Sequence, residues 1–159
     1  AGDRVLDAGT GTGILAAYLG RLGAEVTTYE QDAEFAEVAR DNMAVAGVDD
    51  TVEVRTGDIT EEIDALAGGE PFDLLTLDTE DAPEVVADAA DLLVYGGYLA
   101  VYSPFVENSR ASVEAAEAAG LADIETVDTI QRELTVDDRG TRPSTAGVGH
   151  TCYLTFARR

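Results

Sequence analysis

Four acidic side chains follow four successive predicted strands. Asp7, Glu30 and Asp58 close the first three strands, and Asp78 closes the apolar run 72–77. Because ligands bind at the carboxyl ends of parallel strands, we expect these acids to converge on one site. Each acid alone can equally be a solvated strand end or a helix cap, but four in succession favour a binding site.

Glycines at positions 9, 11 and 13 lie between the first predicted strand and the first predicted helix. Glycine is needed where the backbone takes a positive φ or touches a ligand, and the N–H groups that begin a helix bind polar groups. We interpret this turn as a nucleotide cradle; a turn without a ligand is the alternative. Glu30 can accept both hydroxyls of a ribose. The Asp7 carboxylate would repel a pyrophosphate and attract an ammonium group, so we predict a nucleotide with a positive charge. The glycine spacing differs from that of the dinucleotide-binding motif, which argues against a dehydrogenase.

Strands and helices alternate along the first 120 residues. After residue 120, strand patterns at 124–134 and 149–156 enclose a polar loop without a helix, so the two strands must pair antiparallel. The sequence predicts one α/β domain over residues 1–159, with a Rossmann-like, seven-stranded, mostly parallel sheet and an antiparallel C-terminal hairpin. The other predicted strands are 5–7, 24–29, 52–55, 72–77 and 98–102, and the predicted helices are 14–22, 33–46, 61–66, 83–93 and 106–119.

The chain is strongly acidic, with 32 acids against 10 bases, a net charge of -22 and no lysine. Such a surface suits a cytoplasm of molar salt, where self-repulsion is screened, so we predict a halophilic source and a cytoplasmic location. Attraction to a basic partner is the alternative, but the acids are spread along most of the chain. We predict no membrane span or secretory signal. One cysteine, Cys152, excludes an internal disulfide and a cysteine-cluster metal site, and no metal is predicted.

The stretch Asp-Ala-Gly-Thr-Gly-Thr-Gly, residues 7–13, resembles motif I of the class I S-adenosylmethionine methyltransferases. The resemblance implies S-adenosylmethionine as cofactor. It also implies that Asp58 meets the adenine amino group, that Ile59 packs on the adenine ring, and that Asp78 faces the methyl acceptor. The cofactor-binding residues predicted in this way are Asp7, Gly9, Thr10, Gly11, Thr12, Gly13, Glu30, Gln31, Asp58, Ile59 and Asp78.

Further motifs resemble the tRNA (adenine-N1)-methyltransferases that act on the T-loop, in their archaeal and bacterial form. They are Gly-Gly-Tyr-Leu-Ala-Val-Tyr-Ser-Pro at 96–104, Arg-Glu-Leu at 132–134, Arg-Pro at 142–143 and Gly-His-Thr at 149–151. The chain departs from this family where Ala82-Pro83 replaces Pro-Trp. It also lacks the family's small amino-terminal β domain, so we expect that an upstream segment is missing.

The tRNA resemblance implies roles for the second half of the chain. Asp78 would hold the target adenine and Tyr102 would lie beside it, as the catalytic pair, and the family's tetramer implies a homo-oligomer. Residues 132–159 carry five arginines against three acids, which suits a site for tRNA as the partner. The predicted substrate-binding residues are Tyr102, Ser103, Arg139, Arg142 and His150. From the residues alone, Tyr102 can also be a core tyrosine, and His150 a structural one.

Methyl transfer requires the acceptor lone pair in line behind the methyl carbon, so positioning supplies much of the rate. A ring nitrogen that gains a methyl becomes cationic, and the Asp78 carboxylate would stabilise that charge as it develops. The prediction is therefore methyl transfer to N1 of an adenine in the tRNA T-loop. Two alternatives stay open: a corrin-type or isoaspartyl-type methyltransferase of the same fold, and a non-catalytic cofactor-binding or assembly module.

Overall fold

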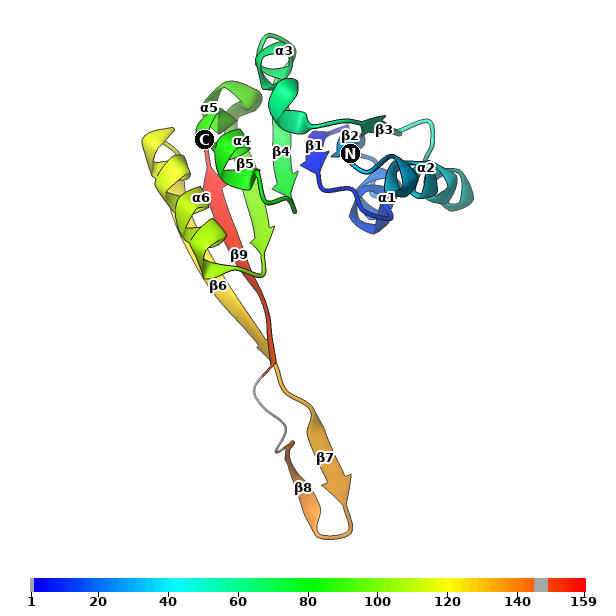
Figure 1. The fold of residues 1–159 in the computed structure, drawn as a ribbon, viewed down its shortest axis with the longest axis vertical. Helices are drawn as coiled ribbons and strands as arrows, with labels where there is room; N and C mark the ends of the chain where they lie inside the picture. The colour runs from blue at the N-terminus through cyan, green and yellow to red at the C-terminus, as the bar shows by residue number, and fades with distance from the viewer. Residues whose placement is uncertain (1, 145–148) are drawn as a thin grey trace.

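The computed structural model describes residues 2–144 and 149–159, and the side chains of His150 and Thr151 lie outside that description. The described chain forms a seven-stranded sheet with helices on both faces and a separate two-stranded sheet (Figure 1). The main sheet consists of β1 (Arg4–Ala8), β2 (Glu25–Glu30), β3 (Val52–Thr56), β4 (Phe72–Leu77), β5 (Leu93–Ser103), β6 (Ala122–Gln131) and β9 (Gly149–Arg158).

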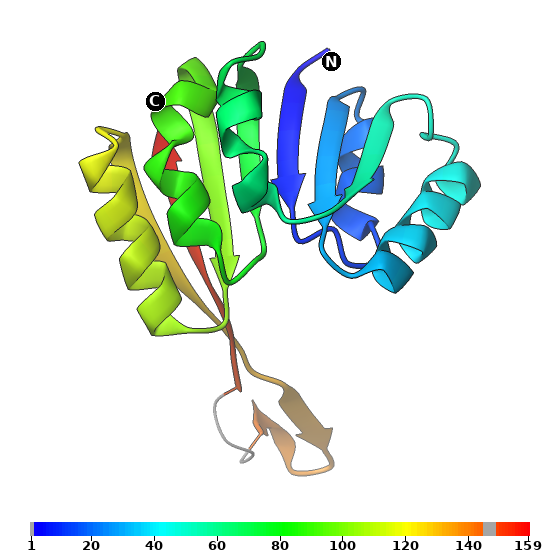
Figure 2. The same cartoon turned by 45° about the horizontal axis from the view of Figure 1, so that its top comes forward.

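The strand order is β3-β2-β1-β4-β5-β9-β6. The chain proceeds outward from β1 to β3 and then crosses back to β4, so the crossover direction reverses between β1 and β4. Because parallel crossovers are right-handed, this reversal puts α1 (Ile14–Arg21) and α2 (Ala33–Ala46) on one face and the later helices on the other (Figure 2). The later helices are η1 (Ile59–Glu61), α3 (Ile63–Ala67), α4 (Ala82–Ala87), α5 (Ala89–Leu92) and α6 (Val106–Ala118). Ligands bind at such a switch point.

Strand β9 runs antiparallel to both of its neighbours, β5 and β6. The pairs β1–β2, β1–β4, β2–β3 and β4–β5 are parallel. The predicted mostly parallel sheet with an antiparallel C-terminal hairpin is therefore confirmed.

Two apolar clusters hold the layers together. The larger one joins β4 and β5 to the later helices and includes Leu75, Val86 and Leu99, each at most 1% exposed. The smaller one lies under α1 and α2 and includes Val26 and Met43. Strand β4 contributes to both clusters, as expected for a central strand that is buried on both faces.

The stretch before β5 differs from the prediction. The predicted helix 83–93 is two short helices separated at Asp88, and the chain then enters β5 at Leu93 instead of Tyr98. Gly96, at φ 84, lies inside the strand, and the pairing of β4 with β5 shifts register there. The two glycines at 96–97 therefore make an irregularity within one long strand, where the sequence predicted a turn before a short one.

The predicted loop between the last two strands contains a further hairpin. Strands β7 (Leu134–Asp137) and β8 (Gly140–Pro143) pair antiparallel with each other and not with the main sheet. This β7–β8 hairpin extends away from the body, beyond the carboxyl ends of the parallel strands (Figure 1). It therefore lies on the side of the sheet where a ligand site is expected.

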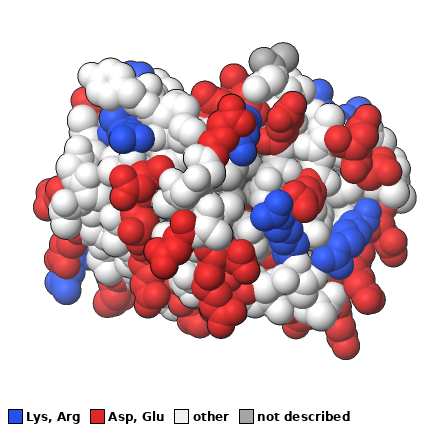
Figure 3. All heavy atoms as spheres, turned by 90° about the horizontal axis from the view of Figure 1, so that it is seen from above, with Lys and Arg blue, Asp and Glu red and all other residues white. Residues whose placement is uncertain are grey.

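Acidic side chains are spread over the amino edge of the sheet, with arginines between them (Figure 3). This distribution agrees with the spread of acids along the sequence.

Among the described residues, none of the helices combines the length and apolarity that crossing a bilayer requires. The same residues contain no group of three or more metal-ligating side chains that could hold an ion.

Candidate active site

The glycine turn lies directly against the end of β4. Gly9 has φ 87, its N–H donates to the Tyr29 carbonyl at 3.0 Å, and a Cβ added to it would lie 1.9 Å from the Asp78 carbonyl oxygen. A Cβ at Gly13, with φ 80, would lie 2.4 Å from the Met43 side chain. Glycine at position 9 is therefore required by both its backbone angle and the close approach of the Asp78 backbone, whereas position 13 needs glycine for its backbone angle, since the end of the Met43 side chain can move.

Glu30, at the end of β2, faces the turn. Its carboxylate accepts the Gly11 N–H at 2.7 Å and the Asp32 N–H at 3.0 Å, one on each oxygen. Each carboxylate oxygen has a second lone pair, so both can still accept a hydroxyl of a ligand. Gly11 has open space where a side chain would begin, which leaves the turn accessible on the ligand side.

Asp7 is only 3% exposed, and both of its carboxylate oxygens accept threonine hydroxyls. Thr28 and Thr76 each donate to it at 2.5 Å. Burial raises the pKa of Asp7, and the two hydroxyl bonds oppose that rise. The charge of Asp7 therefore lies in the wall of the site, and a cationic ligand nearby would stabilise it.

Asp58 precedes η1 and caps it. Its Oδ1 accepts from the hydroxyl and the backbone N–H of Thr60, at 2.7 Å and 2.8 Å, and these bonds lower the pKa of Asp58. Its neighbours Gly57 and Ile59 line a cavity beside the turn. Asp58 itself is not among the residues that line this cavity, and its lowered pKa favours the ionised carboxylate beside it.

Two cavities meet at the carboxyl edge of the sheet. The smaller, of about 340 Å³, lies beside the turn, and the larger, of about 970 Å³, lies between the turn, α1 and the β5–β9 pair. Both volumes fall in the range of small-molecule sites. The smaller cavity is lined by Ala8, Gly9, Gly11, Tyr29, Glu30, Gln31, Phe35, Gly57, Ile59, Asp78 and Thr79.

Asp78 lines both cavities. It directly follows β4, where its N–H donates to the Ala8 carbonyl at 2.8 Å, so its backbone is fixed against β1. Within the described residues, its carboxylate has no recorded hydrogen-bond partner, and partial burial raises its pKa. It is therefore the carboxylate that is available to a ligand where the cavities join.

Thr10, Thr12 and Gln31, also predicted to bind the cofactor, lie in the cavity walls. Thr10 and Thr12 line the larger cavity, where the Thr12 carbonyl accepts from the Asn42 side chain at 2.8 Å. Gln31 lines the smaller cavity and donates to Asp81 at 3.2 Å.

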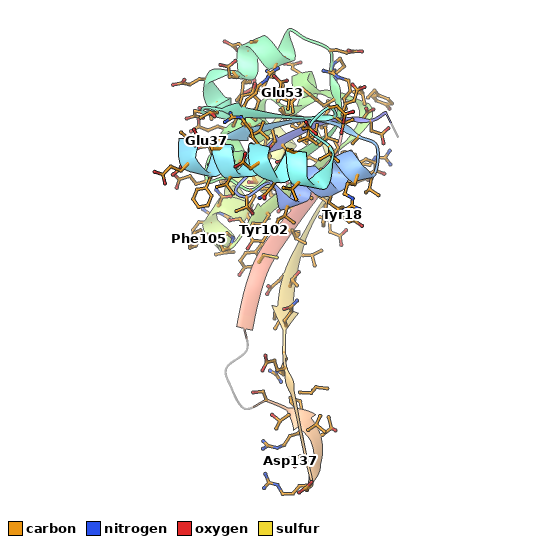
Figure 4. All side chains as sticks on the ribbon, turned by 90° about the vertical axis from the view of Figure 1, so that its right-hand side faces the viewer. Tyr18, Glu37, Glu53, Tyr102, Phe105 and Asp137 are labelled. Carbon is orange, nitrogen blue, oxygen red and sulfur yellow. The ribbon has the colours of Figure 1, made fainter. Side chains whose placement is uncertain are left out.

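Tyr102 and Ser103 end β5 in different environments. Tyr102 is half-buried and lines the larger cavity, which Tyr18 of α1 also lines, and both lie at the lower edge of the body (Figure 4). Ser103 is 4% exposed, and its hydroxyl exchanges hydrogen bonds with the backbone of Phe105 at the start of α6. The structure therefore brings Tyr102 to the cavity and directs Ser103 into the start of a helix.

The predicted substrate arginines lie far from these cavities. Arg139 and Arg142 belong to the β7–β8 hairpin, both within 4 Å of the Asp137 carboxylate, and Figure 4 shows Asp137 at the far end of that hairpin. His150 lies in β9, in register with Ile130, and its side chain is outside the described part.

The positive charge of residues 132–159 is divided between the two edges of the sheet. Arg158 pairs with Tyr98 in register, with its guanidinium 4.6 Å from the ring centre, and Arg159 bonds to the Leu93 carbonyl. These two arginines therefore lie at the amino edge. The net positive charge of residues 132–159 is not gathered in one place, because β9 runs back across the sheet.

Several described side chains in or beside the cavities were not predicted from the sequence, among them Phe35, Thr28 and Thr76. Phe35, on the first turn of α2, is 50% exposed and lines the smaller cavity. The sequence did contain one sign that Phe35 lies at the site, because it belongs to the first helical turn after Glu30. Thr28 and Thr76 had no such signal, because threonine is an ordinary strand residue and only the pairing of the strands brings it beside Asp7.

This sheet order, with its single reversed strand and a glycine turn at the switch point, defines a Rossmann-like domain of the methyltransferase class. A solved S-adenosylmethionine-dependent O-methyltransferase from Thermotoga maritima superposes with a TM-score of 0.84 at 28% identity, over 99% of this chain and 59% of that one. The tRNA (m1A58) methyltransferase TrmI from Aquifex aeolicus gives a TM-score of 0.77 at 25% identity, over 98% and 62%.

The chain belongs to the family described as tRNA methyltransferase complex GCD14 subunit, whose sequence profile matches residues 1–141. It is 34% identical to the tRNA (adenine(57)-N(1)/adenine(58)-N(1))-methyltransferase TrmI of Methanocaldococcus jannaschii, over 99% of this chain and 64% of the relative. The chain thus spans less than two thirds of that protein. The family predicted from the motifs is confirmed.

Proposed function

We propose that residues 1–159 are the catalytic domain of an S-adenosylmethionine-dependent methyltransferase that modifies N1 of an adenine in the tRNA T-loop. The observation that carries the proposal is the Asp78 carboxylate, which lines both cavities without a recorded hydrogen-bond partner among the described residues. Family membership and the identity to the archaeal relative favour tRNA over the corrin-type and isoaspartyl-type alternatives.

The smaller cavity suits the adenosine part of the cofactor. Ile59 and Phe35 supply apolar surface for the adenine, the Glu30 carboxylate can accept the ribose hydroxyls, and Asp58 can accept the adenine amine. The larger cavity begins at the same turn and has Asp7 in its wall, which suits the ammonium end. The donor set therefore fits a cationic nucleoside. When bound, the cofactor supplies an electrophilic methyl group.

Asp78 then has two tasks in the proposed reaction. Its carboxylate can accept a hydrogen bond from the exocyclic amine of the target adenine, which turns N1 toward the methyl group. As N1 becomes cationic, the same carboxylate stabilises the developing charge without having to reorganise. Tyr102, in the wall of the larger cavity, would limit where the base can lie.

The proposal extends to the partner and the setting. The β7–β8 hairpin, with Arg139 and Arg142, would contact tRNA outside the target base. A homo-oligomer, a cytoplasmic location and a high-salt environment are also proposed. They are supported by the family resemblance and by a composition with 32 acids and no lysine.

The test compares Asp78→Asn with Glu80→Gln, which removes the same charge from an exposed neighbour that lines neither cavity. In concentrated potassium chloride, we expect both variants to bind S-adenosylhomocysteine within a few fold of wild type by calorimetry. Asp78→Asn should lose about 10²- to 10³-fold in the rate of 1-methyladenosine formation on a tRNA transcript, because it removes one electrostatic stabiliser. Glu80→Gln should keep the wild-type rate.

Two results would contradict the proposal. Wild-type turnover by Asp78→Asn would remove that carboxylate from the mechanism. Labelled methyl transfer to an isoaspartyl peptide or to small metabolites, with none to tRNA, would assign the site to a different substrate class.

A further inference from the structure

A row of three polar side chains crosses the buried centre of the sheet. Thr28, Asp7 and Thr76 occupy paired positions on the adjacent parallel strands β2, β1 and β4. Residues paired in this way point to the same face of a sheet. All three are at most 9% exposed, and Thr28 is completely buried. The row therefore forms a polar layer beneath the glycine turn.

A fourth hydroxyl connects this row to the turn. The Oγ1 atoms of Thr10 and Thr28 lie 2.5 Å apart. Thr28 has a single hydroxyl hydrogen, and it donates that hydrogen to the Asp7 carboxylate. The Thr28 oxygen must therefore accept from Thr10. With Asp7 ionised, the hydrogen bonds run from Thr10 through Thr28 to Asp7, and Thr76 donates to the other carboxylate oxygen.

Thr28 differs from its partners in one respect. Asp7, Thr10 and Thr76 all line the larger cavity, whereas Thr28 lines neither cavity. Thr28 can therefore influence a ligand only through the groups that it holds. It bonds at the same time to the side chain of the turn and to the buried carboxylate, which no other described side chain is recorded as doing.

We propose that Thr28 is a positioning residue for the cofactor site: its hydroxyl holds Thr10 and Asp7 together, and so keeps the glycine turn in the shape that binds the cofactor. The identity of the cofactor rests on the function proposed above. The role of Thr28 rests on the hydrogen-bond chain itself.

Thr28→Val removes the hydroxyl and keeps the shape of the side chain. Thr10 then loses its acceptor and Asp7 loses one of its two donors, although both stay largely buried. Buried polar groups that lose a partner retain their desolvation cost. We expect the turn to shift to find new partners, and the Kd for S-adenosylhomocysteine to rise roughly ten- to a hundredfold. Thr28→Ser restores the hydroxyl and should recover most of the affinity.

The matched control is Thr155→Val. Thr155 lies in β9, is 1% exposed, and shares a 2.9 Å hydroxyl pair with Thr126. It lines neither of the two cavities. Its substitution removes a similar threonine pair from the same sheet without touching the site, so the Kd should stay at the wild-type value.

A pH series distinguishes positioning from general loss of structure. Two ionisable groups act on Asp7 through space: Asp78 after β4 and Glu30 at the end of β2. Loss of the Thr28 hydroxyl removes an interaction that lowers the pKa of Asp7. The acid limb of S-adenosylhomocysteine binding should therefore move to higher pH in Thr28→Val and stay in place in Thr155→Val.

A double-mutant cycle completes the test. Calorimetry measures the Kd for S-adenosylhomocysteine in four proteins: the wild type, Thr10→Val, Thr28→Val and the double variant. If the two hydroxyls act through one bond, the double variant should bind no more weakly than the weaker single variant. Should Thr28→Val not fold, Thr28→Ser and Thr10→Val give the same comparison, with binding retained in the first and weakened in the second.

Wild-type affinity in Thr28→Val, additive losses in the cycle, or an equal loss in Thr155→Val would each overturn the positioning role while leaving the cofactor assignment intact. Absence of binding by the wild-type protein would instead refute the cofactor assignment, and this inference with it.

Discussion

The contact between the glycine turn and β4 can be tested by adding one methyl group. In Gly9→Ala, the new Cβ would lie 1.9 Å from the Asp78 carbonyl oxygen, whereas real Cβ atoms are essentially never found within 3.0 Å of another atom. The obstacle is backbone, which cannot rotate away. The turn and the end of β4 must therefore separate by roughly 1 Å, the difference between those two distances.

Two costs follow from this substitution. An alanine at φ 87 has a left-handed backbone strain of about 1–2 kcal/mol. Overpacking against β4 adds about 1–3 kcal/mol. Because a 1 Å misplacement of reacting groups can cost about 10²-fold in rate, methyl transfer should fall by that order. The control is Gly120→Ala, because Gly120 has a similar φ of 76 and open space around the new Cβ. This variant should therefore have the backbone strain without the overpacking.

Chemical denaturation and a methyl-transfer assay measure the two costs separately. Gly120→Ala should lose about 1–2 kcal/mol of unfolding free energy and keep the wild-type rate. Gly9→Ala should lose clearly more stability and nearly all activity. Equal destabilisation of the two variants, with equal rates, would show that the turn does not press on β4, and the reasoning would be refuted.

Three more predictions concern the side chains of the site. Phe35→Ala should raise the Kd for S-adenosylhomocysteine about five- to a hundredfold, since stacking of an aromatic ring on a base contributes about 1–3 kcal/mol. The control, Val38→Ala one turn along α2, should leave the Kd unchanged, and calorimetry measures both values. Burial raises the pKa of Asp78, so the transfer rate should fall with decreasing pH through a pKa above 3.8, and a pH–rate profile with its acid limb at or below 3.8 would contradict this. The folded state also holds a proton on Asp7 more tightly than the unfolded state does, so the stability of the wild type falls as pH rises from 3.8 through the raised pKa. The unfolding free energy of Asp7→Asn relative to wild type should therefore increase across that window in urea titrations, and a constant difference would argue against the burial cost.

Much of the fold could be predicted because each boundary has a local cause. The apolar run 72–77 is β4 without change, and Gly47, at φ 68, ends α2 as expected. The glycines at 96–97 show where this reasoning stops. A glycine pair fits a turn and a bulge equally well, and only the partner strand decides, since β4 pairs with β5 on both sides of the irregularity.

The position of a candidate site residue could be predicted where it depends on strand ends and not where it depends on strand register. The four acids could be placed at the carboxyl edge of the sheet because each one lies at or near the end of a strand. Thr28 and Thr76 were missed because a threonine in a strand has the same local pattern whether it packs in a core or donates to a carboxylate. Phe35 was missed because an apolar residue at helical spacing normally packs inward, and here the beginning of α2 faces the cavity instead.

The placement of the arginines limits how the proposed tRNA substrate can be held. Of the five arginines after residue 131, Arg158 and Arg159 lie at the amino edge, away from the cavities. Arg139 and Arg142 share the Asp137 carboxylate, which neutralises part of their charge. Arg139 and Arg142 therefore offer little free charge to phosphates, and in the proposed complex with tRNA counterion release from this pair would contribute little. If tRNA is the substrate, as proposed above, its recognition would rely instead on the shape of the RNA and on stacking of an unpaired base, which salt weakens far less. A target adenine in a loop satisfies that requirement, because a base outside a helix can enter a cavity and present its N1 edge.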